Sequence, residues 1–311
     1  MKIAIIKLSS IGDISHTAFI PYLVSKYIKN AEIHWFCDEL FTDINDGIDC
    51  IHKIHPTISK NAKSKPVAFA KQFLQLFNIA KKERFDAVID FQGTFKSALI
   101  AKFLCTNQNL WGFLYTRDIL AHKVYKKHCN IPLQSNVYQR AISITNEALN
   151  LKISHKEIPI PFLQHKHLTQ ERGIIIFPSS SHECKNYSIQ NFQRLITKIN
   201  NHKITLLFGS SSEEFICKEI ARDRKDIEII GGLNLAKVKS VISTSKCVIG
   251  GDTGILHIAS AMYVKNITLY GPTPSYRTSI HMPHSITLQG NGDVNKIPTK
   301  QIIEAINFLK I

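Results

Sequence analysis

Short β-rich runs alternate with amphipathic segments along most of this chain, and this alternation constrains the fold more than any other feature. In the first half, three runs predict strands: KIAIIKL, EIHWFC and DAVIDF. Residues 14–29, 66–83 and 94–104 predict helices between and after them. Strands that alternate with helices favour parallel sheets covered on both faces. The sequence therefore predicts an α/β protein.

The pattern breaks at residues 155–173 and then starts again. This stretch carries Pro159 and Pro161 without a clear period, which is typical of a linker. Five strands are expected beyond it: GIIIF, ITLLFG, IEIIGG, CVIGG and ITLYG. Helices are expected at about 188–200, 211–223, 235–245 and 253–262. We therefore expect two domains, 1–155 and 156–311, with a ligand cleft between them. A last helix is expected at 298–309, and one option for it is to pack back on the first domain.

The charge and the cysteines narrow the class of protein. The net charge of +15 favours anionic partners such as nucleic acid, phosphorylated lipids or nucleotide sugars. The seven cysteines are scattered without a CxxC pair, which indicates reduced thiols in a cytosolic protein and no zinc framework. No window approaches the roughly 20 apolar residues of a membrane span, and the amino-terminal run IAII is too short for a signal peptide.

The stretch GGDTGILHIASA, residues 250–261, carries the strongest signal for a ligand site. Its turn GDTG joins a strand to a helix, and the unpaired N–H groups and positive dipole of a helix start favour a phosphate. Gly251 and Gly254 let the backbone approach a ligand closely, and Thr253 adds a hydroxyl donor. The alternative is that Asp252 only caps the helix. A cap, however, requires neither the flanking glycines nor the histidine one turn on.

Two further strand-to-helix turns carry polar groups. In FPSSSHECKNYS, residues 177–188, three serines precede Lys185, which can neutralise a phosphate as a point charge. The alternative is a polar loop with an ordinary surface lysine. In ITLLFGSSSEE, Glu213 lies where an acidic residue accepts hydrogen bonds from ribose hydroxyls. Complementing the helix dipole is the commoner role for such a residue.

The stretch KLSSIGDISHT, residues 7–17, follows the first strand with more polar chemistry than a simple connection needs. At the tip of that strand, Asp13 is expected to point into the cleft. Its carboxylate could take a proton from an acceptor hydroxyl as a general base, and His16 lies one turn on. The alternative is that Asp13 is the N-cap of the helix at 14–29.

Several ligand-binding signatures are missing from the sequence. It contains neither GxGxxG nor the P-loop pattern, so a dinucleotide oxidoreductase or a P-loop NTPase is poorly supported. It contains no HExxH, and no two aspartates stand two apart to hold a metal on a nucleotide sugar. Without such a metal, Lys185 and the helix N-terminus would have to offset the charge of a leaving phosphate.

Taken together, these stretches resemble glycosyltransferase family 9, the heptosyltransferases of lipopolysaccharide core assembly. The markers follow the family order along nearly the whole chain: KLSSIGDISHT, DFQGTFKSA, the Lys185 loop, FGSSSEE, GGDTGILHIASA and ITLYGPT. DFQGTFKSA and GDISHT look most like heptosyltransferase I, which adds the first heptose to the Kdo of the inner core. The resemblance implies a GT-B architecture, in which two Rossmann-like domains with parallel sheets face each other across a cleft.

The resemblance also implies a reaction and its residues. The reaction would be an inverting, metal-independent transfer from ADP-heptose to a Kdo–lipid A-type acceptor, without a cofactor. The enzyme would be cytoplasmic and peripheral on the inner membrane, where basic loops meet anionic head groups. Asp13 would be the general base, and Lys185 would stabilise the departing diphosphate. The implied donor-binding residues are Ser180, Ser181, Glu213 (ribose), Leu233 (adenine), Asp252, Thr253, Gly254 and His257. The implied acceptor-binding residues are Lys60, Lys63, Lys65 and Arg117.

The sequence departs from the family pattern at two places. Asn186, Tyr187 and Ser188 stand where a tryptophan and a proline usually follow the lysine, and the acceptor loop has lysines where arginines are common. The alternatives among enzymes are a heptosyltransferase II-like protein, another nucleotide-sugar transferase of the family, or a nucleotide hydrolase. The alternative outside enzymes is a nucleic-acid-binding module, but the lysine-rich segment 53–66 lacks aromatic platforms for bases.

Overall fold

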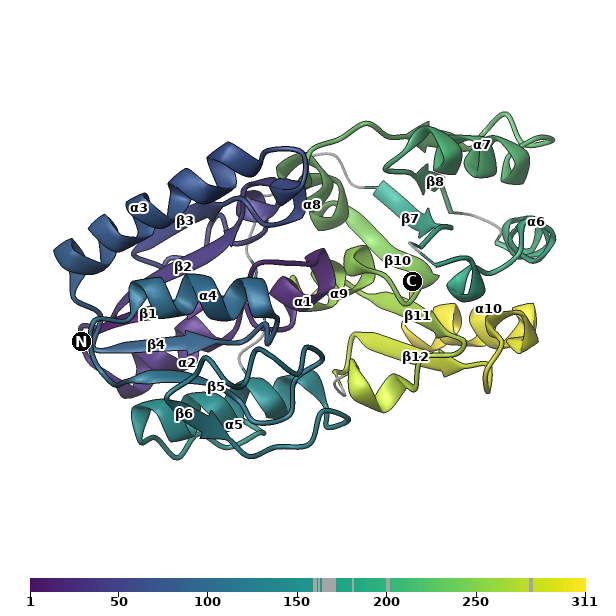
Figure 1. Ribbon diagram of the computed structural model, residues 1–311. Helices are drawn as coiled ribbons and strands as arrows, with labels where there is room; N and C mark the ends of the chain where they lie inside the picture. The colour runs from purple at the N-terminus through teal and green to yellow at the C-terminus, as the bar shows by residue number, and fades with distance from the viewer. Residues whose placement is uncertain (159–160, 162, 164–171, 181, 200–201, 280–281) are drawn as a thin grey trace. The chain divides into compact units, whose positions relative to one another are not determined.

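The chain divides into two compact units, Met1–Leu163 and Gln164–Ile311 (Figure 1). The computed structural model describes residues 1–311 apart from 159, 160, 162, 164–171, 181, 200, 201, 280 and 281. The boundary lies after residue 163, not after residue 155 as expected. One reason is Glu157, which pairs with Lys26 at 2.7 Å and accepts a hydrogen bond from the Tyr27 hydroxyl, both in the first unit. No helix in the described part of the chain has the length and apolar character needed to span a membrane.

The first unit is built on a six-stranded parallel sheet with the order β3-β2-β1-β4-β5-β6. Its strands are β1 (Lys2–Ile6), β2 (Glu32–Asp38), β3 (Lys53–Thr57), β4 (Ala87–Asp90), β5 (Leu110–Phe113) and β6 (Lys127–Cys129). The chain changes its direction of travel across the sheet between the neighbours β1 and β4. In open parallel sheets, ligands bind beyond the carboxyl ends of the strands at such a switch point.

Five α-helices accompany this sheet. They are α1 (Ile11–Ser15), α2 (Ile20–Tyr27), α3 (Pro66–Glu83), α4 (Phe95–Leu104) and α5 (Val137–Leu149), with the 3₁₀ helices η1 (Glu39–Ile44) and η2 (Lys60–Ala62). The single helix predicted at 14–29 is therefore wrong. Pro21 explains the break, because proline is tolerated in the first turn of a helix but not in its interior.

The second unit has its own six-stranded parallel sheet with the order β12-β11-β10-β7-β8-β9. Read from β9 to β12, this is the strand order of the first sheet. Its strands are β7 (Arg172–Phe177), β8 (Ile204–Leu207), β9 (Glu228–Ile230), β10 (Ser245–Gly251), β11 (Asn266–Tyr270) and β12 (Ser285–Gln289). Its helices are α6 (Ile189–Lys198), α7 (Ser211–Ile220), α8 (Leu235–Ser243), α9 (Gly254–Ala261) and α10 (Thr299–Phe308), with η3 (Glu183–Lys185), η4 (Ser275–Arg277) and η5 (Val294–Lys296). The switch point here lies between β7 and β10. Two Rossmann-like units with parallel sheets confirm the predicted fold class.

The last helix, α10, belongs to the core of the second unit. Ile302, Ala305 and Ile306 are buried in one hydrophobic cluster with residues of the sheet, including Ile267. The option that this helix packs back on the first unit is therefore corrected. The apolar face of α10 covers the sheet beside α6 instead.

The burial pattern of α10 predicts that alanine substitutions at two nearby positions have very different effects on stability. Ile306 is 5 % exposed, whereas Phe308 is 75 % exposed. Ile306→Ala should lower the free energy of unfolding by about 2–5 kcal/mol, because it leaves a cavity in the core. Phe308→Ala, the matched control, should change it by less than about 0.5 kcal/mol. Urea denaturation of the full chain measures both, and equal effects would contradict this placement of the helix.

Candidate active site

Asp13 lies just beyond the carboxyl end of β1, at the switch point of the first sheet. It is the third residue of α1, where its Oδ2 atom accepts hydrogen bonds from the backbone N–H of Ser10 (3.1 Å) and the hydroxyl of Ser10 (3.2 Å). This is a capping box, so Asp13 supports the helix without being its N-cap. Its Oδ1 atom lies 3.8 Å from Nζ of Lys7, and 34 % of the side chain stays exposed. The same carboxylate can therefore serve the helix and still reach a substrate.

The charges around Asp13 keep it ionised. Burial alone would raise the pKa of Asp13, but Lys7, the Ser10 N–H group and more distant positive groups such as Arg117 outweigh it and lower the pKa. Lys7 is itself buried and donates a hydrogen bond to the Phe91 carbonyl (3.1 Å). Burial lowers the pKa of Lys7, although the Asp13 carboxylate opposes that shift. The site thus holds an ionised carboxylate whose basicity is tempered by a buried lysine.

The DFQG turn after β4 positions this site. Asp90 is fully buried and accepts hydrogen bonds from the Tyr125 hydroxyl (2.7 Å) and the backbone N–H groups of Gln92 (2.8 Å) and Gly93 (3.3 Å). Burial raises the pKa of Asp90 even though these donors favour its charged form. The Gln92 side chain in turn accepts a hydrogen bond from the Ser9 N–H group (3.2 Å). The turn therefore holds the loop that carries Asp13.

The lysines expected to bind the acceptor lie between β3 and α3, in a loop held by one buried carboxylate. Asp38, at the end of β2, accepts hydrogen bonds from the N–H (2.8 Å) and hydroxyl (2.6 Å) of Ser59 and from the N–H of Lys60 (2.7 Å). Lys60 and Lys63 are exposed, and Lys65 pairs with a glutamate of η1 at 2.7 Å. The loop therefore presents positive charge on a fixed backbone.

Lys96 of α4 joins this basic loop and was not predicted from the sequence. Its Nζ atom donates a hydrogen bond to the Ser59 carbonyl at 3.1 Å. The clue was its place in DFQGTFKSA, because a residue in the first turn after β4 lies at the same edge of the sheet as the loop after β3.

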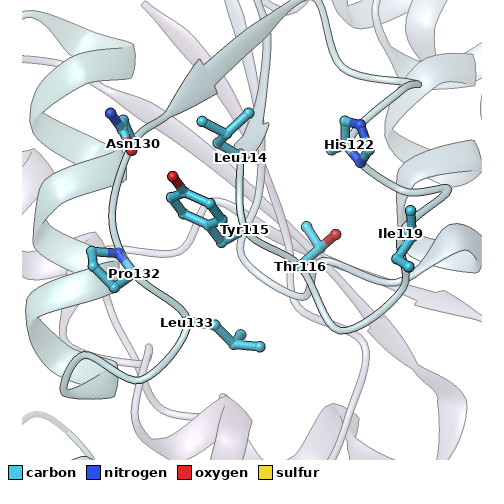
Figure 2. A pocket seen from close by; sticks show the side chains of 8 residues that line it. All are labelled: Leu114, Tyr115, Thr116, Ile119, His122, Asn130, Pro132 and Leu133. Carbon is cyan, nitrogen blue, oxygen red and sulfur yellow. The ribbon is translucent and has the colours of Figure 1, made fainter.

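A cavity of about 470 Å³ opens among the loops that follow β5 and β6 (Figure 2). Its lining is mostly apolar and consists of Leu114, Tyr115, Thr116, Ile119, His122, Asn130, Pro132 and Leu133. The candidate Arg117 belongs to the same loop, is exposed, and lies close enough to Asp13 to lower its pKa. The cavity was not predicted, because two loops without a motif build it.

Lys185 and Asp252 meet at the switch point of the second sheet. Lys185 follows β7 and Asp252 follows β10, and the Lys185 Nζ and Asp252 Oδ2 atoms lie 2.5 Å apart. Nε2 of His257 lies 3.2 Å from the other oxygen of Asp252. Burial alone would raise the pKa of Asp252, but His257 and Lys185 hold it well below its ordinary value. An anionic ligand at this point would compete with Asp252 for Lys185.

Glycines bring the Lys185 segment and β10 together. A Cβ atom at Gly251 would lie 2.7 Å from the Lys185 carbonyl oxygen, and one at Gly250 would lie 2.5 Å from the Phe177 carbonyl oxygen. Contacts this short exclude a side chain at either position. The glycines predicted to admit a ligand therefore also admit the backbone that carries Lys185.

Two hydroxyl groups in the connections after β7 and β10 have no partner in the described chain. Thr253 is the N-cap, but its side chain makes no capping hydrogen bond. The Oγ1 atom of Thr253 and the Oγ atom of Ser179 are buried and have no hydrogen-bond partner among the described residues. Buried polar atoms normally find a partner. Thr253 borders the first N–H groups of α9, and the start of a helix favours an anion.

The loop between β7 and η3 is held by its own side chains. Ser180 donates its hydroxyl to the His182 carbonyl (2.7 Å), and its N–H group donates to the Asn186 side chain (2.7 Å). Ser181, the other predicted serine, lies outside the described residues. Asn186 therefore shapes the loop where the family pattern has a different residue.

The two residues after Asn186 anchor the end of the same loop. Tyr187 is buried in the core, and its hydroxyl donates to the Ile297 carbonyl (2.8 Å). Ser188 is the N-cap of α6 and accepts a hydrogen bond from Asn191 N–H (3.2 Å). The departures from the family pattern have structural roles of their own.

Glu213 and Leu233 lie after β8 and β9, at the same edge of the second sheet as Lys185. The Oε2 atom of Glu213 accepts hydrogen bonds from the N–H groups of Gly209 (2.6 Å) and Ser210 (3.2 Å), so Glu213 completes a capping box at α7. Leu233 is half-buried between β9 and α8. The structure brings these donor-side candidates to one edge, with a capping role for Glu213 that the sequence allowed.

Thr253→Val separates binding from stability at this site. The substitution removes a partnerless buried hydroxyl, so the thermal midpoint should stay the same or rise. Affinity for ADP, the nucleotide that the family resemblance implies, should fall about 10- to 100-fold, because a hydrogen bond to a charged group is worth about 1.5–3 kcal/mol. Calorimetric titration and thermal unfolding measure the two effects.

Asn136→Ala is the matched control for that experiment. Asn136 is an N-cap whose side chain does accept a hydrogen bond, from Tyr138 N–H (2.9 Å) in the first unit. Its loss should cost about 1 kcal/mol of stability and leave ADP affinity unchanged. If Thr253→Val bound ADP as tightly as the wild type, the hydroxyl would not be a ligand.

Two doubly wound units, each with a lysine–aspartate pair at its switch point, are the frame in which the comparisons with known proteins can be read. A family model supplies the class by name. Glycosyltransferase family 9 (heptosyltransferase) matches residues 74–305, and the chain belongs to this family and is a glycosyltransferase.

Individual relatives agree with this membership. The chain is 31 % identical over 301 residues to lipopolysaccharide heptosyltransferase 1 of Campylobacter coli, covering 90 % of this chain and 86 % of that protein. It is 26 % identical over 287 residues to the Escherichia coli K12 protein of the same name, covering 88 % of each. The structure of E. coli heptosyltransferase WaaC with ADP superimposes with a TM-score of 0.84 at 21 % identity, covering 99 % of each chain. That similarity shows a shared fold, and the sequence relatives identify the chain as heptosyltransferase I-like.

Proposed function

We propose that this protein transfers heptose from ADP-heptose to a Kdo residue of a Kdo–lipid A-type acceptor, with inversion and without a metal. The observation that supports the proposal is the pair of Lys185 and Asp252 at the switch point of the second sheet, together with the partnerless hydroxyls of Ser179 and Thr253 in the connections after β7 and β10. The names of the sequence relatives support the heptose and the acceptor. The likeness in fold to WaaC with ADP-2-deoxy-2-fluoro heptose, at a TM-score of 0.85, supports the donor.

The donor is held through its diphosphate. In the proposed complex, the phosphate oxygens replace Asp252 as partners of Lys185 and accept hydrogen bonds from Thr253 and the first N–H groups of α9. Asp252, with His257 beside it, can then accept hydrogen bonds from the hydroxyls of the sugar. The negative charge that develops on ADP falls on a lysine and a helix N-terminus, so no metal is required for its stabilisation.

The remaining donor residues have roles that follow from their positions. Ser180 and Ser181 flank the phosphates, Glu213 meets the ribose through the edge of its carboxylate that α7 does not use, and the backbone at Leu233 meets adenine. Ser180, Glu213 and Leu233 belong to connections at the carboxyl ends of the strands of the second sheet, and the role of Ser181 rests on the family resemblance alone.

The acceptor is activated in the first unit. The Asp13 carboxylate removes the proton of the acceptor hydroxyl, and the oxygen attacks the anomeric carbon on the face opposite ADP. The bond from the anomeric carbon to the diphosphate oxygen breaks, ADP leaves with the electron pair, and the configuration inverts. Lys60, Lys63, Lys65 and Arg117 offer positive charge to the acceptor's phosphates and carboxylates. Binding both substrates makes the step effectively intramolecular.

Asp13→Asn tests the general base. Asparagine keeps a side-chain oxygen for Ser10 but cannot take the proton, so kcat should fall by about 100- to 10,000-fold. ADP affinity should not change, because the diphosphate site belongs to the other unit. Transfer from ADP-heptose to a Kdo-terminated acceptor measures kcat, and calorimetry measures ADP binding.

Ser10→Ala is the control for the capping role of Asp13. It removes one hydrogen-bond donor to the carboxylate and keeps the carboxylate itself, so transfer should fall far less than in Asp13→Asn. Undiminished transfer by Asp13→Asn would exclude the base role. Preference for an acceptor that already carries one heptose would instead favour the heptosyltransferase II-like alternative.

Contact with an anionic membrane follows from the surface of the β5–β6 loop. Four large apolar side chains are exposed there: Leu114, Tyr115, Ile119 and Leu120. The exposed cations Arg117 and Lys123 stand among them, and the whole chain carries a net charge of +15. Apolar side chains mixed with cations are typical of segments that lie in a membrane interface. We infer a peripheral enzyme on the cytoplasmic face of the inner membrane.

Ile119→Ser combined with Leu120→Ser should weaken this contact. Co-sedimentation with vesicles that contain anionic phospholipid should fall several-fold, because the apolar anchor is lost. Transfer to a water-soluble, short-chain acceptor should keep its kcat, which shows that the enzyme remains folded. Wild-type binding that is equal for anionic and neutral vesicles would contradict the charge contribution.

A further inference from the structure

Three side chains that can bind a metal gather at the end of the first sheet opposite Asp13, where β2 begins. Glu32 and His34 are two residues apart on β2, so they project from the same face of the sheet. His52 directly precedes β3, and its N–H group donates to the Ile33 carbonyl at 2.8 Å. One ligand atom from each of Glu32, His34 and His52 lies within 4.8 Å of the others. Strand pairing thus brings together groups from two separate segments.

His34 is a buried histidine with an unused ring nitrogen. It is 1 % exposed, and its Nδ1 atom lies 2.9 Å from Nε2 of His55. Its Nε2 atom is buried and has no hydrogen-bond partner among the described residues. Phe85 packs edge-on against the ring, with 5.1 Å between centroids. A buried ring nitrogen without a partner is uncommon and calls for a ligand.

The contact with His55 supplies the support that a metal-binding histidine usually has. Such a histidine donates its other ring N–H group to a neighbour, which fixes the tautomer and the ring orientation. When His34 donates from Nδ1 to His55, its Nε2 atom carries a lone pair. That lone pair is the electron donor that a metal requires.

We propose that Glu32, His34 and His52 bind one Zn²⁺ ion. Two imidazoles and a carboxylate are a common protein ligand set for zinc, with water in the fourth position. Bond lengths of about 2.0–2.2 Å require the ligand atoms to come closer than they now lie. His52 is exposed and the Glu32 side chain is 44 % exposed, so both can rotate toward the fixed His34.

Lys2 now shares the charge of this cluster. Its Nζ atom lies 3.4 Å from a Glu32 oxygen and 2.8 Å from a Glu83 oxygen. Zinc would take Glu32 from Lys2, and Lys2 would keep Glu83. The lysine is therefore a competitor, and its removal should strengthen zinc binding.

The zinc site is remote from the lysine loop that follows β3. Glu32 and Asp38 are the two ends of β2, so they are about 20 Å apart at roughly 3.3 Å per residue. Asp38 holds the lysine loop, and the zinc cluster lies at the other end of the strand. A bound ion would tie the start of β2 to the residue before β3 and leave the transfer chemistry independent of metal.

Zinc titration of the full, tag-free chain tests this proposal. Calorimetry with ZnCl₂ alone should show one saturable site, and zinc should raise the thermal midpoint by several degrees through mass action. His52→Ala should weaken binding at least tenfold, and Lys2→Met should tighten it several-fold. His155→Ala, which removes an exposed histidine elsewhere in the first unit, is the matched control and should bind as the wild type does.

Two results would overturn the site. One is the absence of saturable zinc binding in the micromolar range. The other is unchanged affinity in both His52→Ala and Glu32→Gln, which would place the ion elsewhere, for example on the exposed thiol of Cys184. Circular dichroism of the variants verifies that each remains folded.

Discussion

Parallel pairing of the strands is the constraint on which this molecule depends. Every strand of a parallel sheet ends at the same edge, so the connections that follow β1, β4, β7 and β10 collect there without a dedicated scaffold. In each sheet the chain changes its direction of travel between the two central strands, so the connections that follow these two strands lead away to opposite sides. The candidate residues of both units follow strands at these edges. The zinc cluster proposed for β2 lies at the amino ends of the strands instead. One strand can therefore carry a zinc ligand at its start and hold the lysine loop at its end.

Both switch points contain a lysine–aspartate pair, but the two pairs differ in which partner is accessible. In the first unit, the lysine is buried and the aspartate is partly exposed. In the second unit, the Asp252 side chain is 6 % exposed and the Lys185 side chain is 22 % exposed. The more accessible partner is in each case the one assigned to chemistry: a base toward the acceptor and a cation toward the diphosphate. The buried partner orients it.

The sequence predicted the central strands and the turns that carry the site, because these segments are continuously apolar and end in unusual polar groups. It did not predict the short strands β3, β5, β6 and β12 or the helix α5. Pro56 argues against a strand in the sequence of β3, but proline is tolerated there because β3 is an edge strand. Asn136 was an available N-cap signal for α5.

Contacts between segments that are distant in the chain could not be predicted from the sequence. The bond between Lys185 and Asp252 joins residues 67 positions apart, and it depends on strand order rather than on any local pattern. By contrast, the spacing of Ser210 and Glu213 was a local signal for the capping box at the start of α7. The cavity in the loop that carries Arg117 also could not be predicted from the sequence, since its walls come from two loops that only tertiary structure brings together.

The buried carboxylate of Asp38 has a consequence for how this enzyme could change over time. It fixes the path of the basic loop through backbone groups, so the side chains at positions 60, 63 and 65 carry little of the loop's own stability. In the proposed acceptor site, substitutions at these positions can alter which sugars and phosphates are accepted while the loop keeps its shape. The proposed donor site has no such freedom, because Lys185, Asp252 and His257 contact one another. Related enzymes can therefore diverge in acceptor choice more readily than in the activated sugar they consume.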